Sequence, residues 1–135
     1  METLLEVKDL KTHFTLPTKK IGGPKPVLKA VDDVSFDVLE GEVLGVVGES
    51  GCGKSTLGRT VLRLENKTAG SVLYEGRDVF ELNNTEIQHL RTQMQMVFQD
   101  PYSSLNPRKK ISSLLSQPLR IHTSLSPAER REKID

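Results

Sequence analysis

A glycine-rich segment at residues 48–56 has the residue types and spacing of a phosphate-binding loop. It matches the pattern G-x-x-x-x-G-K-[ST] and follows an apolar run at residues 43–47 that is predicted to be a strand. Glycines allow positive φ and let the backbone approach an anion closely, because no Cβ intervenes. The proline-free residues 54–63 are predicted to form a helix whose first N–H groups point at the phosphates. The predicted nucleotide site comprises Gly48, Glu49, Ser50, Gly51, Cys52, Gly53, Lys54, Ser55 and Thr56.

Two side chains of this loop supply the charge chemistry that a bound triphosphate requires. Lys54 brings a mobile positive charge to the β- and γ-phosphates, and the Ser55 hydroxyl is the usual Mg²⁺ ligand in this pattern. Each charge-assisted hydrogen bond contributes roughly 1.5–3 kcal/mol, so several together hold a triphosphate in water. Cys52 has no partner cysteine, and we expect no catalytic role for it.

The composition is that expected of a soluble, cytosolic chain. A single cysteine excludes an internal disulfide, and 19 basic against 18 acidic residues give no general signal for nucleic acid. The apolar runs are far shorter than the ~20 residues needed to cross a bilayer, and the N-terminus does not read as a signal peptide. Any membrane role is therefore expected to be peripheral. The three histidines, His13, His89 and His122, show no metal-site spacing.

The elements that must position the loop alternate between strands and helices, which predicts an α/β fold. Strands are predicted at residues 4–10, 34–38, 43–47, 71–74 and 94–98. Helices are predicted at residues 54–63, at 83–91 and from 127 onward.

Turn and capping residues set the boundaries of these elements. The prolines, glycines and lysines of residues 15–26 predict a loop. Asn83 and Glu86 have the spacing of N-cap and N3 residues, and Ser126 with Glu129 repeats it. Prolines at 101, 107 and 118 predict an irregular stretch with short helices after residue 99.

Several segments together resemble an ABC-transporter ATPase: residues 5–10, 30–36, 41–42, the phosphate loop and 97–101. More narrowly, residues 48–59 and 98–108 are similar to the oligopeptide and dipeptide importer branch, and most of all to its second ATP-binding subunit. The resemblance implies a P-loop NTPase (RecA-like) core with an antiparallel β subdomain over residues 1–100. It implies the start of the helical subdomain over 101–135, so that 1–135 is the N-terminal part of one ATPase domain.

The same resemblance assigns further roles in binding ATP and Mg²⁺. Phe14 matches the aromatic that stacks on adenine, although a strand-end phenylalanine equally suits a core. Gln99 matches the glutamine that reaches Mg²⁺ and the attacking water, its alternative being a solvent-facing amide. Catalysis is thus expected from Lys54 and Gln99, and metal binding from Ser55 and Gln99. The basic residues 108–110 suit either a partner or lipid surface, or a solvated face.

The 135 residues lack three motifs that the resemblance places downstream: the signature stretch, the Walker B strand ending in Asp-Glu, and the switch histidine. Positioning and electrostatics carry phosphoryl transfer, so we expect this chain alone to be catalytically incomplete. One alternative is therefore a nucleotide-binding fragment without hydrolytic activity.

The resemblance implies that the intact subunit is an ATPase at the cytoplasmic face of the membrane, coupled to peptide uptake. Its expected partners are a second ATP-binding subunit, two permease subunits and an extracytoplasmic peptide-binding protein, with no nucleic acid. Nickel or another cargo stays open as an alternative. A repair or translation ATPase would require zinc-binding cysteines or a basic patch, and a small kinase or GTPase its own recognition motif. Neither set is present.

Overall fold

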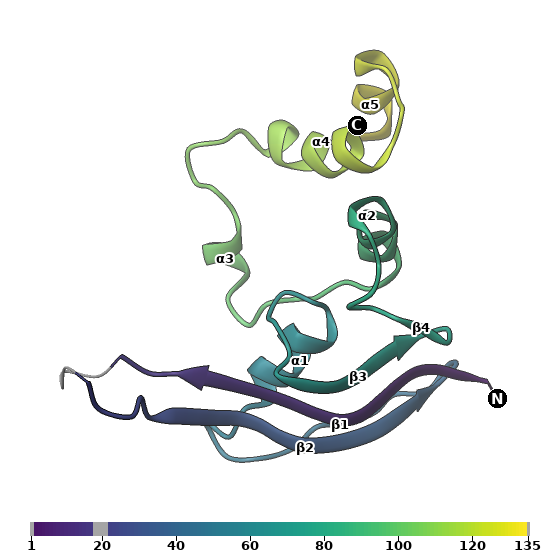
Figure 1. Ribbon diagram of the computed structural model, residues 1–135. Coiled ribbons are helices and arrows are strands. Elements are labelled where there is room, and N and C mark those ends of the chain that lie inside the picture. Colours follow the sequence, from purple (N-terminus) through teal and green to yellow (C-terminus); the bar gives the residue numbers. More distant parts are fainter. Residues whose placement is uncertain (1, 18–21, 135) are drawn as a thin grey trace. The chain divides into compact units, whose positions relative to one another are not determined.

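The computed structural model describes residues 2–17 and 22–134, which form two compact units, Met1–Asn83 and Asn84–Asp135. The first unit contains strands β1 to β4 and helix α1, and the second contains helices α2 to α5 (Figure 1).

An antiparallel sheet forms the first unit, with strand order β2-β1-β3-β4. Its strands are β1 (Thr3–Thr15), β2 (Val27–Leu39), β3 (Ala69–Tyr74) and β4 (Arg77–Asp78). The long strands β1 and β2 run side by side as a curved ribbon (Figure 1). This sheet is the antiparallel β subdomain that the resemblance implies.

Strands β1 and β2 are much longer than the sequence pattern predicts, because irregularities interrupt the alternation of apolar residues. The β1–β2 register shifts between Val7 and Leu10, beside Asp9, which has a φ of 48°. The Asp9 amide donates to Ser35 Oγ at 2.8 Å across the two strands. Bulges of this kind add twist and break the two-residue alternation of apolar side chains. Lys29, Asp32 and Asp33 further obscure that alternation in the first half of β2.

The core lies between this sheet and α1 (Lys54–Val61), which packs against β1 and β2. Its buried apolar side chains are aliphatic, as the composition predicts: Val7, Leu10, Val31, Val61, Val72 and Val79. Fully burying each contributes roughly 1.5–3 kcal/mol. Beyond the helix, the Arg63 guanidinium donates to the carbonyls of Val79 and Leu82 at 3.0 and 2.7 Å. The far end of the helix is thereby held as well.

The strands predicted at residues 43–47 and 94–98 are wrong, because both segments are irregular. Residues 43–47 are exposed, and residues 94–98 are exposed except for the half-buried Met94 and Met96. Val43 and Val47 are each 96% exposed, and Val97 is 95% exposed. Among residues 2–17 and 22–134, neither segment pairs with a strand. An apolar run becomes a strand only when a neighbour bonds its N–H and C=O groups and another layer covers its side chains. The described residues supply neither to these segments.

The second unit consists of α2 (Asn84–Gln93), α3 (Pro101–Ser104), α4 (Ile111–His122) and α5 (Pro127–Ile134). The predicted capping box at α5 is confirmed. The Ser126 amide donates to Glu129 Oε2 at 2.7 Å, and the Glu129 amide donates to Ser126 Oγ at 3.3 Å. Within the described ranges, no helix combines the length and apolar character needed to span a bilayer.

Pro118 lies inside α4 and does not break regular structure there, contrary to the prediction. The φ of proline is compatible with a helix, but an interior proline removes one N–H donor and its ring crowds the carbonyl four residues earlier, so Pro118 weakens α4 without ending it. Prolines at 101 and 127 instead begin helices, at the first helical position where a missing N–H costs nothing.

Candidate nucleotide site

The phosphate loop turns into α1 through glycines in left-handed conformations. Gly51 has a φ of 78°, and Gly53, the N-cap of α1, has a φ of 103°. A Cβ at Gly53 would lie 2.0 Å from the carbonyl oxygen of Ala30 in β2. Both the backbone angle and the contact with β2 therefore require glycine at this position.

The Lys54 ammonium folds back onto the loop. Its Nζ donates to the carbonyl oxygens of Gly48 and Glu49, both at 2.6 Å, and lies 3.4 Å from Cys52 Sγ. The loop thus holds a positive charge among its own backbone atoms. The loop and its lysine therefore lie together, and their role in binding phosphate stays a prediction.

The start of α1 supplies hydrogen-bond donors next to this charge. No side chain caps the helix at Gly53. The N–H groups of a first helical turn have no acceptor within the helix and carry the positive end of its dipole. Ser55 is exposed in the same turn. This donor set, with Lys54 beside it, fits a polyphosphate and a hydroxyl-ligated Mg²⁺.

A buried hydroxyl pair, which the sequence analysis missed, holds α1 against β1. Thr12 Oγ1 and Thr60 Oγ1 lie 3.0 Å apart, and Thr60 Oγ1 also donates to the carbonyl oxygen of Thr56 at 2.8 Å. The only local signal is that Thr60 precedes Val61 on the helix face that packs on the sheet. Its partner is 48 residues away, so no periodicity could identify it.

Phe14 lies near the end of β1, opposite Leu28 in the strand register. Its ring is partly exposed and is therefore not fully taken up by the core. Adenine stacking on this ring stays a prediction.

Gln99 is exposed and lies outside the helices of the second unit. Its role at Mg²⁺ and the attacking water stays a prediction. The basic residues 108–110 are likewise exposed.

His13, which lies in β1, takes part in a hydrogen-bonded cluster with Asp32 and Lys29. His13 Nε2 lies 2.9 Å from Asp32 Oδ1, and Lys29 Nζ lies 3.2 Å from Asp32 Oδ2. The hydrogen bond with His13, followed by that from Lys29, lowers the pKa of the Asp32 carboxyl. In the part of the chain that the structure describes, no group of three or more histidine, cysteine or acidic side chains is arranged to hold a metal ion.

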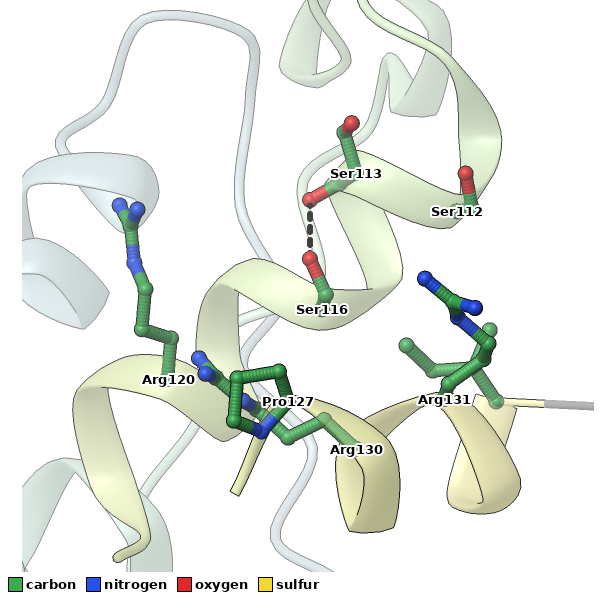
Figure 2. Close-up of a pocket in the computed structure, with 8 residues that line it drawn as sticks. Ser112, Ser113, Ser116, Arg120, Pro127, Arg130 and Arg131 are labelled. Atoms are coloured by element: carbon green, nitrogen blue, oxygen red, sulfur yellow. Dashed lines mark hydrogen bonds between the residues drawn. The ribbon is translucent and has the colours of Figure 1, made fainter. Parts of the chain in front are cut away.

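A hollow of about 390 Å³ lies between α4 and α5 in the second unit. Serines and arginines make up most of its lining: Ser112, Ser113, Ser116, Arg120, Pro127, Arg130, Arg131 and Ile134. Figure 2 shows Arg120 and Arg131 on opposite sides of the hollow, with Arg130 beside Pro127 between them. The glycine-rich loop stays the predicted nucleotide site.

Comparison of the sequence with known proteins agrees with the loop geometry. The profile of the ABC transporter family matches residues 31–134. The chain is 45% identical to the oligopeptide transport ATP-binding protein AppF of Bacillus subtilis, a match covering 99% of this chain and 41% of that protein. It is 50% identical to the dipeptide transport ATP-binding protein DppF of Escherichia coli, over 98% of this chain and 39% of that protein. The chain thus spans about two fifths of the length of these relatives.

Comparison of the structure identifies the fold. A dimeric, post-hydrolysis ATP-binding cassette bound to ADP and Pi matches with a TM-score of 0.73 at 23% identity, over 96% of this chain and 53% of that one. A nucleotide-free cassette from an ABC transporter matches with a TM-score of 0.61 at 25% identity, over 98% of this chain and 46% of that one. The predicted α/β fold of the ABC ATPase type and the resemblance to peptide-importer subunits are confirmed. The phosphate loop, the cassette fold and the profile match lead to one conclusion: the chain belongs to the ABC transporter family.

Proposed function

We propose that this chain binds ATP with Mg²⁺ as part of the ATP-binding subunit of a peptide importer. The observation that carries the proposal is the Lys54 ammonium, held 2.6 Å from two loop carbonyls beside the uncapped start of α1. The nature of the relatives supports the transport role, since they are named as oligopeptide and dipeptide transport ATP-binding proteins.

In this proposal each site residue has a defined task. The loop amides and Lys54 neutralise the charge of the β- and γ-phosphates, while Phe14 stacks on the adenine. Ser55 and Gln99 are the side chains that would hold Mg²⁺. A cation held there would offset the negative charge that develops during phosphoryl transfer. Gln99 also orients the attacking water.

Hydrolysis and transport belong to the larger assembly. We propose that two ATP-binding subunits bind ATP at the cytoplasmic face, coupled to two permease subunits and an extracytoplasmic peptide-binding protein. Through its phosphate loop, this chain by itself binds nucleotide. Because the 135 residues lack the signature and Walker B motifs, it accelerates hydrolysis only slightly.

The test is calorimetric binding of ATP in the presence of Mg²⁺. Lys54→Ala removes the point charge at the phosphates and is expected to weaken ATP binding at least tenfold, which corresponds to about 1.4 kcal/mol. Lys133→Ala, which removes an exposed lysine from α5 in the other unit, is the matched control and should bind like wild type. Equal ATP affinity of wild type and Lys54→Ala would refute the assignment.

A further inference from the structure

We infer that Thr12 and Thr60 are a pair of positioning residues that ties the strand bearing Phe14 to the last turn of α1 and, through the Thr56 carbonyl, to its first turn. The inference rests on the proposed nucleotide site and concerns how its two halves are held at a fixed separation. All the residues involved lie in the first compact unit.

The two hydroxyl groups are sealed from solvent. Thr12 is 1% exposed and Thr60 is fully buried, and the two Oγ1 atoms are 3.0 Å apart. They are the buried polar side chains in a core that is otherwise aliphatic. Among the described residues, no buried side-chain polar atom lacks a hydrogen-bond partner.

Proton counting fixes the direction of the hydrogen bonds. A threonine hydroxyl has one proton and two acceptor lone pairs. Thr60 donates its proton to the Thr56 carbonyl at 2.8 Å, so the Thr12 hydroxyl must be the donor to Thr60. The result is a directed chain from β1, through Thr60, to a backbone carbonyl in the first turn of α1.

Both ends of this series of hydrogen bonds lie next to the groups that would bind ATP. Thr56 follows Ser55 in the loop, and Thr12 precedes Phe14 by two residues on β1. The opposite end of the helix contacts β2, where Gly53 leaves no room for a Cβ beside Ala30. Helix α1 is therefore fixed at its N-cap against β2 and in its last turn against β1.

Two apolar side chains would fill this space equally well but would not fix the position of α1 along β1. Valine has nearly the shape of threonine but lacks the hydroxyl, so it can neither donate nor accept a hydrogen bond. A hydrogen bond that is buried without water has a narrow range of distance and angle. The pair therefore sets the spacing between the adenine platform and the phosphate loop, beyond filling the core.

The experiment compares ATP with inorganic tripolyphosphate, which occupies only the phosphate half. In Thr12→Val, ATP affinity should fall three- to tenfold, while tripolyphosphate affinity should change less than twofold. Thr12→Ser keeps the hydroxyl and should restore the ATP to tripolyphosphate ratio of wild type. Thermal unfolding of each variant separates the change in binding from the change in stability.

Parallel losses for both ligands, or no loss for either, would show that the pair only fills the core and would overturn the inference. If Thr12→Val does not fold, comparing Thr12→Ser with Thr12→Ala in the same assay isolates the hydroxyl. Failure of wild type to bind ATP would refute the proposed function and the inference with it. ATP binding with an unchanged ratio in the variants would refute the inference alone.

Discussion

Valine side chains in this chain differ sharply in burial from one segment to another. In the antiparallel sheet, Val7, Val31 and Val72 are buried and their strands are paired. In the segments 43–47 and 94–98, Val43, Val47 and Val97 are almost fully exposed and unpaired within the described residues. The residue type is the same in both. The difference is a partner strand and a covering helix, so burial here depends on the neighbours that a segment finds.

The largest loss of stability is expected where α1 approaches β2 most closely. Gly53→Ala should destabilise the first unit by roughly 2–5 kcal/mol. The added Cβ would overlap the carbonyl oxygen of Ala30, and the φ of residue 53 is left-handed. Denaturant unfolding measures the loss. The control is Gly41→Ala, which has a φ of 75° but nothing within 4 Å of its Cβ. That variant should lose only the backbone term, roughly 1–2 kcal/mol. Equal losses would mean that α1 does not abut β2.

A matched pair of valine truncations tests the comparison directly. Val72→Ala empties space in the core and should cost roughly 1.5–3 kcal/mol of unfolding free energy. Val47→Ala removes the same two methyl groups from a side chain that is 96% exposed, and should change stability by less than about 0.5 kcal/mol. A large loss in Val47→Ala would show that residues 43–47 are buried in solution, and the contrast would collapse.

The smallest effect concerns α5, whose start is secured by its own residues. Ser126→Ala removes the capping hydroxyl and should cost about 1 kcal/mol of helix stability, seen as lower helicity by circular dichroism. Ser124→Ala, on an exposed serine before the helix, is the control.

The same cap also predicts a pH dependence. Hydrogen bonding from Ser126, first through its side chain and then its backbone, lowers the pKa of Glu129 below the ordinary 4.5. The helix is therefore stabilised above pH 4.5, and this stabilisation is lost as the pH falls through the lowered pKa. A helicity profile in Ser126→Ala that matches wild type across this acid range would contradict the role of the capping box.

Features encoded by a few adjacent residues were predictable from the sequence. The phosphate loop, the start of α1 at Lys54 and the capping box of Ser126 and Glu129 each depend on contacts within about four residues. Capping and left-handed turns have strong residue preferences for physical reasons, so the pattern is sufficient.

Features that depend on distant partners were not predictable. The strand pattern at 43–47 says nothing about whether a neighbour is present to pair with it. The bulge at Asp9 depends on a hydrogen bond between the Asp9 amide and Ser35, which is 26 residues away. The contact of Gly53 with Ala30 and the pair of Thr12 with Thr60 arise only when the sheet and helix meet.

The exposed run at residues 43–47 has a consequence for the protein at high concentration. Short, uncharged, valine-rich windows without proline tend to stack between copies as cross-β assemblies. Glu42 and Glu49 flank this window, so in-register stacking would bring like charges together at both ends. These two carboxylates would oppose self-assembly through a segment that the described residues leave uncovered.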